Sequence, residues 1–296
     1  MLDPAWWALF TIIAAAAQTV RNATQRGLTA SLGTVGATHV RFLFGFPFAL
    51  FFLAAVMIAL DQGVPQLPLV YWPWVIVGAF AQIAATALML AAMNRRSFVV
   101  VYAYIKTEPV LVALFGLLFL GDAVTPGMAM AILIATAGVV TMALKPGTSP
   151  DWKATLLGLA AGAMFALSSV GFRGAILSLG LSSYVLAATF TLVTGLLMQA
   201  ALLSLYLWLR QPVVLASIIA AWRPSLFAGF MGALASQFWF LAFALATAAS
   251  VRTLALVEVL FAQGISRFIF KQATSGRERI GILLIVIGVV LLLWVH

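Results

Sequence analysis

The feature that most constrains this chain is a series of long apolar runs with few charged residues inside them. A helix needs about 20 apolar residues to cross roughly 30 Å of hydrocarbon. Each run is continuous, unlike the alternating segments of about ten residues that build a membrane β-barrel. We therefore expect an all-α integral membrane protein with ten transmembrane helices. The runs cover residues 5–25, 34–60, 70–93, 97–119, 125–144, 154–173, 181–209, 223–245, 250–270 and 279–295.

Composition excludes several classes of protein. With 65% apolar and 8% charged residues, the chain cannot cover a soluble globular surface. It has no cysteine and two histidines, so we expect no disulfide, no metal site and no cofactor. No phosphate-binding GxxxxGK[ST] run occurs, which argues against ATP-driven transport. We also expect no enzyme, because no Ser/His/Asp set with workable spacing is visible.

The positive charges predict an orientation. A net charge of +9 would suggest a nucleic-acid partner in a soluble protein, but here Lys and Arg gather at helix ends, so we expect none. One set of alternating helix ends carries eleven of them, and the opposite set carries only Arg173. Cytoplasmic loops are enriched in Lys and Arg, which predicts both termini in the periplasm. The eleven are Arg21, Arg26, Arg95, Arg96, Lys145, Lys153, Arg210, Arg223, Lys271, Arg277 and Arg279.

The second half of the sequence repeats the first. At an offset of 150 residues Glu108 matches Glu258, which is informative because carboxylates are rare in this chain. Each half holds five predicted helices, and an odd number makes the second half enter the membrane in the opposite sense. Inverted repeats of this kind are typical of alternating-access transporters. The other matches are Arg26-Gly27 with Arg173-Gly174, residues 31–33 with 178–180, 138–140 with 288–290, Pro73 with Pro224 and Gly78 with Gly229.

These residues carry a family resemblance. The run from Glu108-Pro109-Val110 to residues 119–122, followed by Gly-Val-Val at 138–140, resembles the end of an EamA domain of the drug/metabolite transporter superfamily. The resemblance implies two EamA units, residues 1–147 with helices one to five and residues 148–296 with helices six to ten. It also implies a ten-helix arrangement around a central cavity. Within the superfamily the chain resembles the YddG-type amino-acid exporters, which move amino acids outward.

Two carboxylates are expected deep in the membrane. Glu108 lies about 11 residues into the apolar run 97–119, near the bilayer midplane. A carboxylate at this depth is a candidate proton carrier or substrate partner. The alternative is a structural clamp, which the repetition at Glu258 fits at least as well. Both interpretations remain open at this stage.

Three further side chains are predicted to face water. Tyr102 and Lys106 are spaced i, i+4 and so share one helix face. The residue that matches Tyr102 in the second half is Arg252. Lys106 and Arg252 could bind the carboxylate of an amino acid, or each could pair with Glu108 or Glu258 and serve only the fold.

Other polar and aromatic residues complete the predicted substrate site. Gln82 and Trp239 combine an amide with an aromatic wall, which suits a zwitterion with an apolar side chain. Gln18, Asn22 and Ser168 are additional candidates on equivalent helices of the two halves. Helix packing is the alternative explanation for each of them, because polar side chains also link helices in lipid.

The sequence thus predicts a secondary transporter of small metabolites, most simply amino acids including aromatic and other neutral ones, in the bacterial inner membrane. The expected partners are a small-molecule substrate and the lipid bilayer, and the expected state is a monomer. A channel or facilitator, an exchanger of the drug or nucleotide-sugar type, and a membrane enzyme acting on lipid are the alternatives. Saturable counterflow distinguishes a carrier from a channel, and a catalytic dyad or metal cluster would favour the enzyme.

Overall fold

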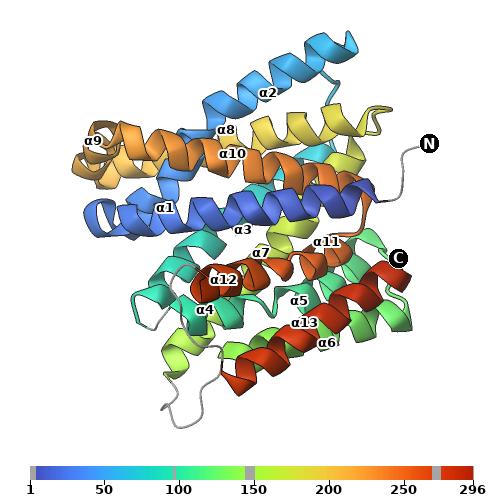
Figure 1. The fold of residues 1–296 in the computed structure, drawn as a ribbon. Helices are drawn as coiled ribbons and strands as arrows, with labels where there is room; N and C mark the ends of the chain where they lie inside the picture. The colour runs from blue at the N-terminus through green and yellow to red at the C-terminus, as the bar shows by residue number, and fades with distance from the viewer. Residues whose placement is uncertain (1–4, 96–97, 144–150, 269–274, 296) are drawn as a thin grey trace. The chain divides into compact units, whose positions relative to one another are not determined.

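The computed structural model describes residues 5–95, 98–143, 151–268 and 275–295. Within these ranges all regular secondary structure is helical, which confirms the all-α part of the predicted fold class. The elements are α1 (Trp6–Leu43), α2 (Gly45–Leu60), α3 (Tyr71–Met93), α4 (Phe98–Ile105), α5 (Glu108–Phe115), the π-helical turn η1 (Gly116–Leu120), α6 (Pro126–Ala143), α7 (Trp152–Ser178), α8 (Tyr184–Arg210), α9 (Pro212–Ala220), α10 (Trp222–Leu245), α11 (Ala248–Leu254), α12 (Val257–Phe268) and α13 (Gly276–Val295) (Figure 1).

Several segments are long and apolar enough to cross a bilayer, so the chain is a multi-pass membrane protein. Six candidate spans meet both criteria within the described residues, and Glu108–Leu120 and Pro126–Met142 are shorter apolar helices. The count of ten crossings stays a prediction. The six spans are Gly27–Leu60, Tyr71–Met93, Trp152–Ser178, Tyr184–Arg210, Trp222–Leu245 and Gly276–Val295.

The chain folds into two compact units. Unit 1 contains residues 1–83 and 171–245, and unit 2 contains residues 84–170 and 246–296. Each unit therefore combines segments from both halves of the sequence. The predicted division into residues 1–147 and 148–296 is a division by sequence repeat, and its boundary lies outside the described residues.

The N-terminal segment of unit 1 is a helical hairpin. Gly33, at φ 67° and ψ −179°, interrupts the helical backbone inside α1. Gln25 Nε2 donates a hydrogen bond of 2.6 Å to the carbonyl oxygen of Ala37, so the segments before and after Gly33 run side by side. Only glycine adopts this φ and ψ without strain. The sequence predicts two helices here, at 5–25 and 34–60, and the break at Gly33 agrees with that interpretation.

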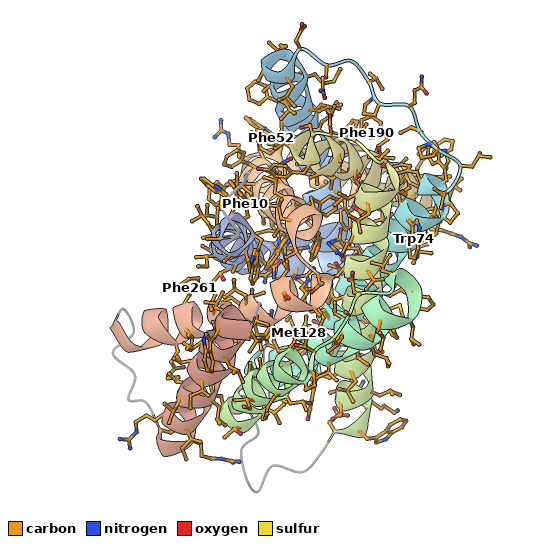
Figure 2. The ribbon with its side chains drawn as sticks, turned by 90° about the vertical axis from the view of Figure 1, so that its right-hand side faces the viewer. Phe10, Phe52, Trp74, Met128, Phe190 and Phe261 are labelled. Carbon is orange, nitrogen blue, oxygen red and sulfur yellow. The ribbon has the colours of Figure 1, made fainter. Side chains whose placement is uncertain are left out.

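Small residues bring the helices of unit 1 together. Figure 1 shows α1 and α10 side by side. A side-chain carbon at Gly229 of α10 would lie 2.5 Å from Phe44, which links α1 to α2. A carbon at Gly174 of α7 would lie 2.5 Å from the ring of Trp74 of α3, which Figure 2 labels. Glycines at such contacts let membrane helices approach closely, where dispersion forces stabilise the pair.

In unit 2 the helices α6 and α13 make a reciprocal contact (Figure 1). A side-chain carbon at Gly138 would lie 2.7 Å from the carbonyl oxygen of Gly281, and one at Gly288 would lie 2.8 Å from that of Ala131. At the offset of 150 residues, Gly138 corresponds to Gly288 and Ala131 corresponds to Gly281, so the two contacts are equivalent under the repeat. An exchange of this kind is the mark of a two-fold relation between two surfaces. The contact therefore supports the internal repeat.

Matched glycines in unit 1 support it as well. Gly33 and Gly180, 147 residues apart, both have positive φ, at 67° and 60°. Two residues before each glycine, a serine hydroxyl donates to the carbonyl oxygen three positions back, Ser31 to Leu28 at 3.2 Å and Ser178 to Ala175 at 2.8 Å. The two halves thus end their first long helix with the same local structure.

Two predicted helices are broken. The run 97–119 was expected to form one continuous helix, but α4 ends at Ile105 and α5 begins at Glu108. The run 250–270 is divided in the same way between α11 and α12. Apolar residues continue on both sides of each break, so the apolar runs did not predict the breaks, although Lys106, Thr107 and Glu108 interrupt the first run locally. The short helix α9 was also not predicted.

Candidate functional site: a buried ion-pair cluster at two helix breaks

The two helix breaks of unit 2 carry the same charge pattern. Lys106 directly follows α4, and Arg252 lies in the last turn of α11. Glu108 and Glu258 lie in the first turns of α5 and α12. A helix carries partial negative charge at its C-terminus and partial positive charge at its N-terminus, so both placements are favourable. Pro109 supports the start of α5, where its missing N–H costs no hydrogen bond.

Glu258 is bound by two side chains of the first break. The ammonium of Lys106 forms an ion pair with Glu258 Oε1. The hydroxyl of Tyr102 donates a hydrogen bond of 2.5 Å to the same oxygen. The Lys106 nitrogen also lies 5.0 Å from the centre of the Tyr102 ring, within range of a cation–π contact. The predicted shared face of Tyr102 and Lys106 is therefore present, and it is directed at a carboxylate.

Glu108 is bound by the second break and by α7. Arg252 Nε lies 3.0 Å from Glu108 Oε1 and donates a hydrogen bond of 2.8 Å to Ser169 Oγ. The Ser169 hydroxyl lies 3.3 Å from the same Glu108 oxygen. We refer to Tyr102, Lys106, Glu108, Ser169, Arg252 and Glu258 as the ion-pair cluster.

The four charged side chains of the cluster are removed from solvent. Their exposed fractions are 4% for Lys106, 3% for Glu108, 8% for Arg252 and 1% for Glu258. Taking a charge out of water costs several kcal/mol, and a close, hydrogen-bonded opposite charge is needed to offset that cost. Two cations against two carboxylates satisfy this requirement. The arrangement leaves the cluster with no net charge.

The partners are exchanged between the two halves of the sequence. Tyr102 binds Glu258, and their counterparts at an offset of 150, Arg252 and Glu108, bind each other. This reciprocity matches the contact between α6 and α13. It favours a structural role for both glutamates, because each glutamate lies at the helix break of one half and binds a residue at the helix break of the other half.

α7 supplies both a contact surface and a partner for the cluster. A side-chain carbon at Gly162 would lie 3.1 Å from the carbonyl oxygen of Ile105, the last residue of α4. The small residue therefore lets the end of α4 lie against α7. Ser169 contacts the cluster, whereas the predicted Ser168 is buried and its hydroxyl has no hydrogen-bond partner within the described ranges. Ser168 is predicted as a substrate contact, and that stays a prediction; the sequence did not single out Ser169 as a contact of Arg252.

Three predicted site residues of unit 1, Gln18, Gln82 and Trp239, take part in two polar pairs. Gln82 Oε1 accepts a hydrogen bond of 2.9 Å from Gln199 Nε2, which also reaches the carbonyl oxygen of Ala79. The indole N–H of Trp239 donates to Gln18 Oε1 at 3.0 Å. These pairs link α3 to α8 and α10 to α1. Such links stabilise helix contacts in lipid, the alternative that the sequence left open.

Sequence reasoning missed a residue next to Asn22. Arg21 is 4% exposed, and its Nε and Nη2 donate to Asn22 Oδ1 at 3.3 and 2.7 Å. It was counted only as a basic residue near a helix end. The available signal was its spacing, because Gln18, Arg21 and Gln25 recur at i, i+3 and i+7 on one face of α1.

The residues of the predicted substrate site are divided between the two units. Gln18, Asn22, Gln82 and Trp239 belong to unit 1, and Tyr102, Lys106, Ser168 and Arg252 belong to unit 2. A single substrate site built from all of them stays a prediction. Within the described residues, no group of three or more His, Asp or Glu side chains is placed to hold a metal ion.

Comparison with known proteins gives a family for the first half of the chain. Residues 5–144 match the model of the EamA-like transporter family. No curated protein matches the sequence. A solved structure described only as "Crystal structure of protein" shares the fold with a TM-score of 0.69 and 19% identity, over 97% of this chain and 99% of that one. Residues 5–144 thus match the EamA-like transporters of the drug/metabolite transporter superfamily, which implies that this multi-pass membrane protein is a membrane transporter.

Proposed function

We propose that this protein is a secondary transporter that exports small metabolites, with amino acids as the substrate class, across the bacterial inner membrane. The observation that carries the proposal is the pair of helix breaks at Lys106–Thr107 and Ala255–Leu256, at matching positions of the two sequence halves. Discontinuous helices at equivalent positions of a repeat are typical of secondary transporters, whose substrate sites lie near such breaks. The match of residues 5–144 to a transporter family supports the same function.

The proposed mechanism is alternating access between two inverted five-helix repeats. The transporter works as a monomer with both termini in the periplasm, and neither ATP nor a cofactor takes part. Amino acids exit along their own gradient or in exchange for a second solute. A channel is the second candidate, and it is less well supported because pore-lining rings usually come from several subunits.

The proposed substrate contacts are Gln82, Tyr102, Lys106, Trp239 and Arg252, with Gln18, Asn22 and Ser168 in supporting roles. The ion-pair cluster adds a condition to this proposal. Lys106 and Arg252 are already held by Glu258 and Glu108, so a substrate carboxylate has to compete with a protein carboxylate for each cation. A substrate carboxylate that binds Lys106 or Arg252 would therefore weaken the ion pairs that join the two helix breaks. Such a coupling would make substrate binding and helix movement the same event.

Counterflow into proteoliposomes tests the function. Liposomes loaded with an unlabelled amino acid are diluted into the labelled compound, and the panel contains aromatic and other neutral amino acids, a nucleotide sugar and a cationic drug. We expect saturable, transient accumulation of labelled amino acids that protein-free liposomes lack. Accumulation of the nucleotide sugar or the drug alone would reassign the substrate class. Conductive flux far above carrier turnover, without counterflow, would identify a channel.

A further inference from the structure

We propose that α9 of unit 1 lies in the membrane interface and, with Arg210 and Arg223 at its two ends, binds anionic phospholipids of the surrounding bilayer. The chemical group that the two arginines recognise is the phosphate of the lipid headgroup. This lipid site contains none of the predicted substrate residues, and it does not depend on the proposed function.

α9 is too short to cross the membrane. Gln211, at φ −146° and ψ 58°, ends α8, and Pro212 begins α9 at a position where its missing N–H costs no hydrogen bond. The nine residues of α9 rise about 14 Å, roughly half of the hydrocarbon thickness. The helices α8 and α10 on either side are both candidate spans. α9 therefore joins two spans at one surface of the membrane, where α8 ends and α10 begins (Figure 1).

One face of α9 is held against the α1 hairpin. A side-chain carbon at Gly36, in the second leg of the hairpin, would lie 2.9 Å from Val214 Cγ1 and 3.8 Å from Ile218 Cδ1. Val214 and Ile218 are spaced i, i+4, so they share a face, and Ile218 is fully buried. This contact fixes which side of α9 is turned toward the protein.

The opposite face of α9 is apolar and uncovered. At 100° per residue, its five members span an arc of about 120° that is centred opposite Val214 and Ile218. Val213 is 77% exposed and Ile219 is 61% exposed. An apolar helix face of this kind, left open beside membrane spans, is typical of helices that lie in the plane of the interface. The five exposed residues are Pro212, Val213, Ala216, Ile219 and Ala220.

The neighbouring ends of α8 and α10 favour lipid as the occupant of this face. Trp208 and Leu209 in the last turn of α8 are exposed, and so is Trp222 at the start of α10. Tryptophan is enriched where membrane helices pass from hydrocarbon to headgroups. The apolar face of α9 therefore continues a surface that the two spans already present to lipid.

The charges beside α9 favour an anionic lipid. Arg210 and Arg223 are both exposed, and neither forms an ion pair in the part of the chain that the structure describes. The guanidinium carbon of Arg223 lies 5.4 Å from the centre of the Trp222 ring. The sequence contains no Asp or Glu between Asp151 and Glu258, so no acidic residue is near them along the chain. Arginine beside a membrane is attracted to anionic lipids and can bind two phosphate oxygens in parallel.

The first test measures what covers the exposed face. The chain has no cysteine, so Val213→Cys and Ile219→Cys each provide a unique thiol for a fluorescent label. The labelled proteins are placed in vesicles of phosphatidylglycerol and phosphatidylcholine and quenched with brominated phospholipid or with aqueous iodide. We expect quenching by the brominated lipid and protection from iodide at both positions. Phe51→Cys, at an exposed residue within the span Gly27–Leu60, is the lipid control, and Gln62→Cys, exposed after α2, is the aqueous control.

The second test measures lipid selection at the same two labels. Brominated phosphatidylglycerol and brominated phosphatidylcholine are compared as quenchers at equal content, and the ratio gives the relative affinity. We expect phosphatidylglycerol to be preferred at both positions. Arg210→Gln and Arg223→Gln should each lower that preference by up to about fivefold. Arg279→Gln, which removes an exposed arginine of α13, is the matched control and should change nothing.

Arg210→Lys and Arg223→Lys keep the charge, so they should fold and retain most of the preference. Quenching by iodide alone would show that the face lies in water and would overturn the proposal. Protection from both quenchers would also overturn it, and would indicate that protein covers the face. Equal quenching by the two brominated lipids, or a preference that both glutamine variants keep in full, would reject Arg210 and Arg223 as an anionic-lipid site.

Discussion

Arg252 Nε lies 3.0 Å from Glu108 Oε1, although the two residues come from opposite halves of the sequence. The counterpart of this pair joins Tyr102 to Glu258. The two broken helices of unit 2 are therefore joined by these two contacts, and each contact pairs a residue of one half with a glutamate of the other half. This relationship explains why a chain with so few carboxylates places two of them at matching positions in apolar segments.

Removing one charge from the pair should destabilise the protein. Glu108→Gln leaves the buried Arg252 without its carboxylate, a loss that costs about 3 to 5 kcal/mol for a buried pair. We expect lower expression and a lower unfolding temperature, measured by differential scanning fluorimetry in detergent. Arg252→Gln should act similarly, and the double variant should cost less than the sum of the two single changes. Asp61→Asn, at an exposed carboxylate, is the control and should change little.

The same variant separates a structural role from a proton-carrying role. If Glu108 serves the fold, the folded fraction of Glu108→Gln protein should exchange substrate with the pH dependence of the wild type. The measurement is counterflow at several external pH values, normalised to the amount of folded protein. An abundant Glu108→Gln protein that exchanges substrate but no longer responds to a pH gradient would identify Glu108 as the proton site.

The hydroxyl of Tyr102 should contribute to stability by itself. Tyr102→Phe keeps the ring near Lys106 but removes the donor to Glu258, and a hydrogen bond to a charged group is worth about 1.5 to 3 kcal/mol. We expect a lower unfolding temperature than in the wild type, and a smaller loss than in Glu108→Gln. Tyr206→Phe, at an exposed tyrosine of α8, is the matched control. Equal unfolding temperatures for both tyrosine variants would contradict the contact.

The contact between α6 and α13 should not tolerate a larger residue. An alanine methyl at position 138 would lie 2.7 Å from the carbonyl oxygen of Gly281, so Gly138→Ala forces the helices apart. Overpacking typically costs about 1 to 3 kcal/mol, and the reciprocal variant Gly288→Ala should lose a similar amount. Gly63→Ala, where a methyl meets no atom within 4 Å, is the control. Unfolding temperatures of Gly138→Ala and Gly288→Ala that equal the control would refute the close approach.

The polar pairs of unit 1 should matter for transport if they contact substrate. We expect Gln82→Ala and Trp239→Ala to reduce counterflow about tenfold or more, since a hydrogen bond to a charged group has that effect on affinity. The controls are Gln62→Ala and Trp294→Ala, which change an exposed glutamine and a tryptophan that is 85% exposed. Well-folded Gln82→Ala and Trp239→Ala proteins with normal counterflow would show that the substrate binds elsewhere.

Topology gives a test that does not depend on substrate. The distribution of Lys and Arg predicts both termini in the periplasm. An alkaline phosphatase fused to the C-terminus should be active, because that enzyme folds only outside the cytoplasm, whereas a fluorescent protein that requires the cytoplasm should stay dark. The opposite pair of results would reverse the orientation.

The sequence by itself determined the helical membrane fold, the positions of the long helices and the repeat, because apolar length and periodic matches are local properties of the chain. It also located Glu108 and Glu258 in apolar segments. It did not reveal the helix breaks, since residues 106–107 and 255–256 lie inside long apolar runs and hydropathy does not report backbone conformation.

Only the tertiary structure decided which side chains meet. Lys106 and Glu108 are two positions apart and each pairs with a residue about 150 positions away, a choice that depends on how helices pack. Ser168 and Ser169 differ by one step of about 100° around α7, and packing selected Ser169. The burial of Arg21 likewise depends on the turn at Gly33 and the glycine surface of α10. Side-chain pairing is a non-local property of the chain. For this reason Arg21 counts in the sequence only as a basic residue near a helix end, whereas in the fold it is a buried group.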